Sequence, residues 1–417
     1  MSAATWRNSL QSLQVRSAAF IFVVASLARA ADTPTTLVSG DEAEPIHSAV
    51  IRQEAWTQDP VRRLRVDAER RLKEGPWTVT ADRPKGIDLD PHEYYSESPF
   101  YWPDAANPAG SYLRRNGQMN PALFAANRTA LDAMCDAVFT LGTAAYLLDD
   151  ARYASRAARI VQTWFILPRT RMEPNMQHAG TIPGSKGGAA SVPGGGVSEG
   201  RPLIRAIQGM EFLAKTEAWD PKDEAATRKW FEEYLHWLTP ADAAPANRRG
   251  GGDNSIWRAA LDAAAATFAE DAAAQRRVFD SYRGRAFPRP PRAGGRGAAI
   301  LPAPVLAASL EARATICRIA QLHGVDLWSL PARNDGTIAT PIDSLEASLA
   351  DPKQWSKEQA AGFQSDGVYL MAFAGMGLNK PDYVAQFRKL ERPENAWLAL
   401  VDLLVGRWEA AAHQTRH

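Results

Sequence analysis

Cysteine is scarce in this sequence, with two in 417 residues. Cys135 and Cys317 belong to no Cys/His spacing of the kind that binds zinc, so we expect no metal site of that class. Each lies in an apolar stretch with helical periodicity. We therefore predict two buried thiols on separate core helices, although an oxidising compartment would allow the two to pair.

The sequence also has no marked excess of positive or negative charge, because it contains 48 Lys and Arg residues and 47 Asp and Glu residues. Without the first thirty residues the net charge becomes about −2. A near-neutral chain does not favour general nucleic-acid binding, so we expect no nucleic-acid partner, and any anionic ligand must be held by local basic clusters. The glycine-rich run 187–196 follows no strand and no GK[ST] motif is present, so we expect no nucleotide and no other cofactor.

Only one long apolar run is present, at the N-terminus. Arg7 and Arg16 precede the apolar segment 17–28, and Ala28-Arg29-Ala30 forms a small-x-small cleavage site. The run is too short for a permanent transmembrane helix. We therefore predict a signal peptide at residues 1–30 and a periplasmic or secreted protein that has no membrane contact once the signal is removed.

Alternation of period two is almost absent, whereas period 3.6 recurs along the chain. The pattern predicts a single all-α domain over residues 31–417, built as an (α/α) toroid of antiparallel helical hairpins whose long loops form a cleft. We expect a monomer. The predicted helices span residues 59–73, 127–149, 151–165, 203–214, 225–238, 254–268, 272–282, 305–322, 342–349, 365–373, 381–390 and 396–411.

Two loops interrupt the helices and carry the candidate ligand-binding side chains. The loop 90–121 interleaves aromatic residues with proline and glycine, and places arginine and asparagine beside them. This mixture suits stacking on sugar rings and gripping carboxylates, although an ordered surface loop pinned by its own aromatics would look the same. Its candidate substrate-binding residues are Tyr101, Trp102, Tyr112, Arg114, Arg115, Asn116 and Asn120. The second loop, 170–202, carries Arg171, Asn175 and His178.

Four segments resemble the alginate lyase superfamily of polysaccharide lyases, in the order expected for that family. They read PFYWPD (99–104), YLRRNGQMNP (112–121), WFILPRTRMEPNMQHAGTIPG (164–184) and GVDLW (324–328). The resemblance is clearest over residues 78–360. It implies an (α/α) toroid that cleaves a uronate-containing polymer, of the alginate or glucuronan type, by β-elimination. In such a reaction Asn, Arg or His neutralises the sugar carboxylate while Tyr or His moves the proton, and no metal or cofactor is required.

The catalytic motifs of the family are the part that this sequence does not reproduce. When the family's NNHxxW motif is aligned on Trp257, Asn254 occupies the position where the family usually has histidine. A second alignment, which places the start of the motif on residues 247–250, is less favoured. The family's Arg-to-Tyr motif falls in the run 284–304, which contains Arg296 but no tyrosine, and Tyr282 is the nearest phenol. One explanation is a divergent lyase that uses His178, the only histidine in the matching loops, as base, although His178 could equally satisfy a loop carbonyl. The remaining catalytic candidates are Asn175, Asn254, Arg296 and Tyr282, with Arg171 and Trp257 binding substrate.

Two other functions fit the same residues. A protein on this scaffold can bind a polyuronate without cleaving it. A glycoside hydrolase would need two carboxylates across a cleft, for which Asp104 and Asp253 are the available pair. The run 284–304 is either a natural insertion or the product of a shifted reading frame.

Overall fold

The computed structural model describes residues 35–107, 110–115, 118–184, 190–191, 199–238, 253–283, 303–331, 337–349, 368–390 and 394–414. The predicted signal peptide, Asn116 and Arg296 lie outside the described residues, as does most of the run 284–304. For Asn254 and Asp253 only the backbone is described.

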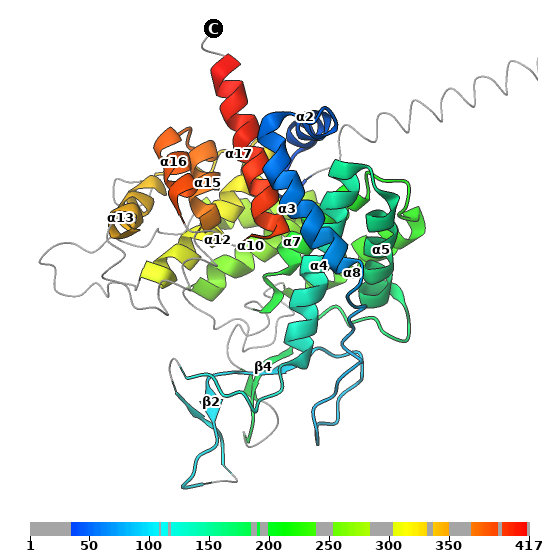
Figure 1. Cartoon of the computed structure of the whole chain (residues 1–417). Helices are drawn as coiled ribbons and strands as arrows, with labels where there is room; N and C mark the ends of the chain where they lie inside the picture. Colours follow the sequence, from blue (N-terminus) through cyan, green and yellow to red (C-terminus); the bar gives the residue numbers. More distant parts are fainter. Residues whose placement is uncertain are drawn as a thin grey trace, which may run out of the picture.

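Helices dominate the described chain, which confirms the predicted all-α class and the (α/α) toroid (Figure 1). Neighbouring helices pack in pairs along the chain, α4 against α5 and α7, α10 against α11 and α12, and α15 against α16. The helices are α2 (Gly40–Ile51), α3 (Ala55–Arg71), α4 (Ala126–Leu148), α5 (Ala151–Val161), α7 (Leu203–Leu213), α8 (Pro221–Leu238), α10 (Asp253–Phe268), α11 (Ala272–Arg283), α12 (Ala303–Leu322), α13 (Ala339–Leu349), α15 (Val368–Gly377), α16 (Pro381–Lys389) and α17 (Ala396–Gln414).

Most predicted helices are found within a few residues of their expected ends. Two differences concern the N-terminal part. The helix α2 was not predicted, although Ser39 and Glu42 form a capping box at its start. The helix α3 begins at Ala55 rather than at residue 59. After α5 the chain continues as one π-helical turn, Gln162–Ile166, so the predicted helix 151–165 is two elements.

Helix α4 is the central core helix. Among the described residues it alone is long and apolar enough to cross a bilayer, and 72% of its most apolar window is buried inside the fold, as in the core helix of a globular protein. It crosses α7 at close range because glycines meet at the crossing: a Cβ added to Gly142 would lie 2.1 Å from the carbonyl oxygen of Gly209. Cys135 on α4 and Cys317 on α12 are buried free thiols, as predicted.

The two loops singled out in the sequence pair with one another beneath the helices (Figure 1). Strand β1 (Tyr95–Glu97) runs parallel to β4 (His178–Ile182), which in turn pairs with β5 (Ala190–Ser191). The register passes from Tyr95 opposite His178 to Glu97 opposite Thr181, so β4 carries a bulge. Strands β2 (Tyr101–Trp102) and β3 (Leu113–Arg114) form a separate antiparallel pair within the aromatic loop.

The first described residues are held firmly to the helices. The amide N–H groups of Leu37 and Val38 both donate to Gln208 Oε1, at 2.8 and 2.9 Å. Thr36 donates to the buried carboxylate of Glu211 through its amide and its hydroxyl, and Arg318 Nε donates to the Leu37 carbonyl. This segment brings the Leu37 side chain to the cavity described next.

Candidate active site

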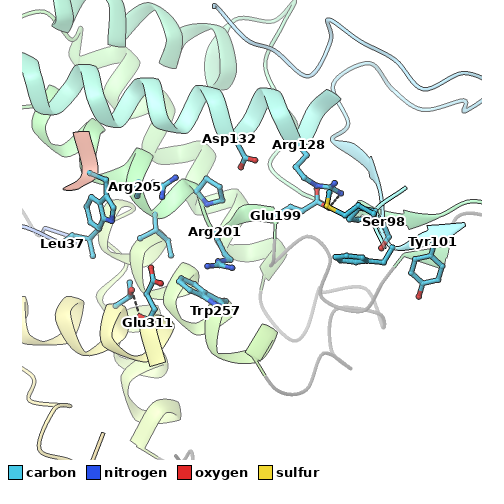
Figure 2. A pocket seen from close by; sticks show the side chains of 18 of the residues that line it. Leu37, Ser98, Tyr101, Arg128, Asp132, Glu199, Arg201, Arg205, Trp257 and Glu311 are labelled. Atoms are coloured by element: carbon cyan, nitrogen blue, oxygen red, sulfur yellow. Dashed lines mark hydrogen bonds and ion pairs between the residues drawn. The ribbon is translucent and has the colours of Figure 1, made fainter. Parts of the chain in front are cut away.

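A cavity of about 630 Å³ lies where the aromatic loop meets α4, α7, α10 and α12 (Figure 2). Its walls carry four arginines and three carboxylates, so arginines outnumber carboxylates in the lining. Aromatic rings line it from the loop side and from the helix side. The charged residues of the lining are Arg114, Arg128, Arg201, Arg205, Asp132, Glu199 and Glu311; its aromatic residues are Phe100, Tyr101, Trp257, Phe373 and Trp397.

Glu199 ties the loop to the helices at this cavity. Its carboxylate accepts hydrogen bonds from the phenol of Tyr94 at 2.5 Å and from the hydroxyl of Ser96 at 2.7 and 2.8 Å. It also pairs with Arg128 of α4 at 2.7 Å. Only 10% of the Glu199 side chain is exposed. Because three donors are satisfied by one nearly buried carboxylate, the position of β1 relative to α4 is fixed.

Arg201 and Trp257 form a stacked pair on the opposite wall. The guanidinium carbon of Arg201 lies 3.8 Å from the centroid of the Trp257 ring, well within the range of a cation–π contact. The ring is 6% exposed, and its Nε1 has no hydrogen-bond partner among the described residues. The stack restrains the planar guanidinium, and Arg201 is positioned for a ligand with less loss of conformational entropy than a freely rotating side chain.

Asp132 lines the cavity one helical turn after Arg128 on α4, where its side chain is accessible to solvent. The pKa of Asp132 is raised to about 6, first by the partial burial of the carboxyl group between the cavity walls and then by the negative charge of Asp136, while Arg205 and Arg128 oppose the shift. Arg205, on α7, is paired with Asp136 at 2.8 Å. A carboxyl group with this pKa exists in both protonation states near neutral pH.

The aromatic loop contributes some of its predicted residues to the cavity and uses others to hold its own shape. Tyr101 and Arg114 line the cavity and face one another across the β2–β3 pair. The guanidinium carbon of Arg115 lies 5.2 Å from the centroid of the Trp102 ring. Trp102 also donates a hydrogen bond through Nε1 to the Gln118 carbonyl.

Two further residues of this loop have structural contacts. Asn120 is 7% exposed; its amide donates to the Tyr101 carbonyl and its side-chain oxygen accepts from the Ala122 amide. The Tyr112 amide donates to the carbonyl of Pro183, which ties the aromatic loop to the second loop. Neither residue lines the cavity, and the contacts of both hold the loop in shape.

The predicted catalytic residues of the second loop do not line this cavity. His178 is half-buried at the start of β4, and Asn175 accepts a hydrogen bond from the Gln177 amide. Arg171 is exposed and pairs with Glu173 at 3.2 Å. Within β4, Gly180 lines the cavity. It lies at the bulge, and its backbone has a positive φ of 65° there.

Tyr282 is placed in the core rather than at the cavity. It is 2% exposed, its phenol lies 3.6 Å from the Cys317 thiol, and burial raises its pKa well above the usual range. The phenol is buried and does not line the cavity, so this position gives no support to the predicted catalytic role of Tyr282. Of the two carboxylates considered for a hydrolase, Asp104 does not line the cavity and its carboxylate accepts from the Ala106 amide, whereas the Asp253 side chain lies outside the described structure.

Sequence reasoning missed the charged residues that the helices contribute. Arg128, Asp132 and Asp136 follow one another at four-residue spacing on α4, a polar stripe on an otherwise apolar helix. That stripe was the available signal. Among the described residues, no group of three or more His, Cys, Asp and Glu side chains is arranged to hold a metal ion.

Comparison with solved structures shows which known folds this chain resembles. The fold is similar to that of an alginate lyase from Bacteroides ovatus, with a TM-score of 0.77 and 21% sequence identity. The superposition covers 89% of this chain and 99% of that chain. Alginate lyase A1-III, solved in complex with a tetrasaccharide, is 13% identical with a TM-score of 0.44, over 70% of this chain and 77% of that chain, too weak a likeness to place residues. No curated protein sequence matches this chain.

The family model described as Alginate lyase matches residues 78–295, just over half of the sequence. The matched part includes the aromatic loop, α4, the second loop and α10, which together build most of the cavity. The chain therefore belongs to the alginate lyase family of polysaccharide lyases.

Proposed function

We propose that this lyase cleaves a uronate-containing polymer, of the alginate or glucuronan type, by β-elimination in the cavity between the aromatic loop and α4, α7, α10 and α12. The observation that carries the proposal is the stack of Arg201 on Trp257 in a cavity lined by three further arginines. A guanidinium fork binds a carboxylate through two parallel hydrogen bonds. The aromatic walls offer flat surfaces to sugar rings.

The chemistry explains why cations are needed at this place. The proton on the carbon next to a sugar carboxylate is too weakly acidic to be removed directly. When it leaves, negative charge spreads onto the carboxylate, and a fixed cation stabilises that charge more in the transition state than in the ground state. Arg201 is suited to this role because its stack holds the guanidinium in one orientation and the walls exclude part of the solvent.

The first experiment tests the reaction itself. Incubation with alginate and with glucuronan is expected to produce a conjugated double bond that absorbs in the ultraviolet. New reducing ends without this absorbance would indicate hydrolysis instead, and binding without either product would indicate a binding protein. Absence of all three signals on both polymers would refute the proposal.

The second experiment tests Arg201. Removing a charged hydrogen-bonding group costs about 1.5–3 kcal/mol, so Arg201→Ala is expected to lower kcat/KM about tenfold to a hundredfold. Arg62→Ala is a matched control, because Arg62 is exposed and pairs only with Asp59 in the described structure. Equal activity of Arg201→Ala and the control would remove Arg201 from the site.

The base predicted from the family resemblance is tested separately. If His178 takes the proton, His178→Ala abolishes turnover and leaves polymer binding within a few-fold. Unchanged turnover would agree with the position of His178 outside the cavity lining and would end that prediction.

We also propose that the protein is exported to the periplasm or the medium and acts as a monomer. The charged start, apolar segment and cleavage site within residues 1–30 support export, as does the anchoring of the chain from Thr36 onward, shortly after that site. Sequencing the N-terminus of the exported protein is expected to give Ala31 as the first residue. Light scattering on the purified protein tests the oligomeric state.

A further inference from the structure

We propose that Asp132 is the catalytic base of this lyase, the side chain that accepts the proton from the sugar ring. The inference rests on the proposed β-elimination and names a residue for its proton transfer. It is drawn from the placement of Asp132 among the charged groups of the cavity, where the carboxylate faces open space rather than a partner.

The neighbouring cations are already engaged by other carboxylates. Arg128, one turn before Asp132 on α4, pairs with Glu199 at 2.7 Å. Arg205 of α7 pairs with Asp136 at 2.8 Å. Among the described residues, the Asp132 carboxylate forms no hydrogen bond and no ion pair, so its oxygens are available to a ligand in the cavity. Figure 2 shows its side chain projecting from α4 toward the space between Arg201 and Glu199.

Glu199, which lines the same cavity, shows the contrast. Its two oxygens accept from Tyr94, Ser96 and Arg128, so taking up a proton would disrupt several hydrogen bonds at once. Glu199 is thus an anchor, whereas Asp132 can change its protonation state without breaking a contact in the described structure. Glu311 lines the cavity from α12 and is the other carboxylate that the experiment must compare.

The electrostatic surroundings make Asp132 a stronger base than an ordinary aspartate. Burial and the charge of Asp136 raise its pKa to about 6, so the group is mainly ionised at neutral pH yet holds a proton about a hundredfold more tightly than usual. A uronate carboxylate bound nearby would raise the pKa again, because a like charge disfavours ionisation. The charged groups around it are Arg128 and Asp136 on α4, Arg205 on α7, and Glu199, Arg201 and Glu311 across the lining.

The proposed step balances without a cofactor. An oxygen of Asp132 accepts the proton from the ring carbon that bears the carboxylate. The electron pair of that C–H bond forms the carbon–carbon double bond, and the adjacent C–O bond to the next sugar breaks with its electrons on oxygen. That oxygen takes a proton, from Asp132 itself or from water, and leaves as a hydroxyl group. Asp132 returns to the carboxylate either directly or by losing its proton to water.

The test is the pH dependence of kcat/KM for double-bond formation on alginate or glucuronan. The wild-type protein is expected to show activity that rises with pH through about 6, because only the ionised carboxylate accepts the proton. Asp132→Asn is expected to lower kcat at least a hundredfold, with KM within a few-fold and unfolding unchanged. Asp132→Glu, which restores a carboxylate, is expected to recover part of the activity.

Two further variants separate catalysis from a structural effect. Asp136→Asn removes a like charge and releases Arg205, and both changes are expected to move the acidic limb of the profile to lower pH. Asp149→Asn is the control: Asp149 ends α4 about 26 Å from Asp132, and its positive φ of 50° suits asparagine. Its profile is expected to match that of the wild type.

The outcomes are distinct. If the wild type forms no double bond on either polymer, the proposed function fails. If the wild type is active and Asp132→Asn keeps its rate and its acidic limb, the role of Asp132 is wrong. The same holds if Glu311→Gln abolishes the acidic limb while Asp132→Asn leaves it in place.

Discussion

Replacing Glu199 with glutamine tests whether one carboxylate holds the aromatic loop against the helices. Glutamine keeps one oxygen acceptor but loses the charge that pairs with Arg128, and its NH2 group faces the donors of Tyr94 and Ser96. Breaking a buried ion pair costs about 3–5 kcal/mol. Arg128 is 22% exposed and one acceptor is kept, so the expected loss of unfolding free energy is about 2–3 kcal/mol.

The assay is urea unfolding of Glu199→Gln beside Glu173→Gln. Glu173 also pairs with an arginine, Arg171, but the Arg171 side chain is 50% exposed and that of Glu173 is 34% exposed, and ion pairs near the surface contribute about 1 kcal/mol or less. The kcat/KM of Glu199→Gln is expected to fall as well, because the same loop brings Tyr101 and Arg114 to the cavity. If both glutamine variants unfold alike and the activity is unchanged, Glu199 does not anchor the loop.

Three further predictions concern the scaffold. Gly142→Ala places a methyl group against the Gly209 backbone, and the expected destabilisation of about 1–3 kcal/mol in urea outweighs the gain in helix propensity; a more stable variant would contradict the crossing of α4 and α7. Burial raises the pKa of Glu211 to about 7, so the folded state holds the Glu211 proton more tightly than the unfolded chain does. This tighter proton binding adds on the order of 3 kcal/mol to the free energy of unfolding below pH 4.5, and the addition is lost as the pH rises to about 7. Unfolding of Glu211→Gln is expected to depend less on pH over this range, and an unchanged dependence would show that another group titrates. Tyr282→Phe is expected to keep full kcat and to lose at most about 1.5 kcal/mol of stability, whereas loss of turnover would return Tyr282 to the catalytic set.

The fold was predictable because helical periodicity is strong where a helix is long and buried. Helix α4 was predicted as residues 127–149 and is found at Ala126–Leu148. The strands were not predicted, because segments of two to five residues inside aromatic and glycine-rich loops show no alternation. The pairing of β1 with β4 joins residues about eighty positions apart, which no local pattern reveals.

The candidate site was predicted in part, and the division has a physical cause. Tyr101, Arg114 and Trp257 belong to motifs with a recognisable composition, and all three line the cavity. Asp132 and Arg205 belong to short polar stripes on mainly apolar helices, and such a stripe normally indicates the solvent-facing side. Only the packing of α4 against α7 turns them toward a cavity. Tyr282 shows the reverse case, since it shares a buried face with Phe279 on α11 and helical periodicity favoured the core.

The helices of the structure change what the replacement of the family's usual histidine by Asn254 implies for catalysis. If proton transfer depended on the histidine of the family's NNHxxW motif, asparagine at position 254, in the first turn of α10, would remove the reaction while leaving sugar binding. The charged residues of α4 and α7 offer another route, because Asp132 lies among arginines on two helices whose backbones touch at Gly142 and Gly209. Rigid helices hold such a group more accurately than a loop does. Glu199 links the same helix α4 to the aromatic loop, so the proposed sugar-binding wall and the proposed base move as one unit.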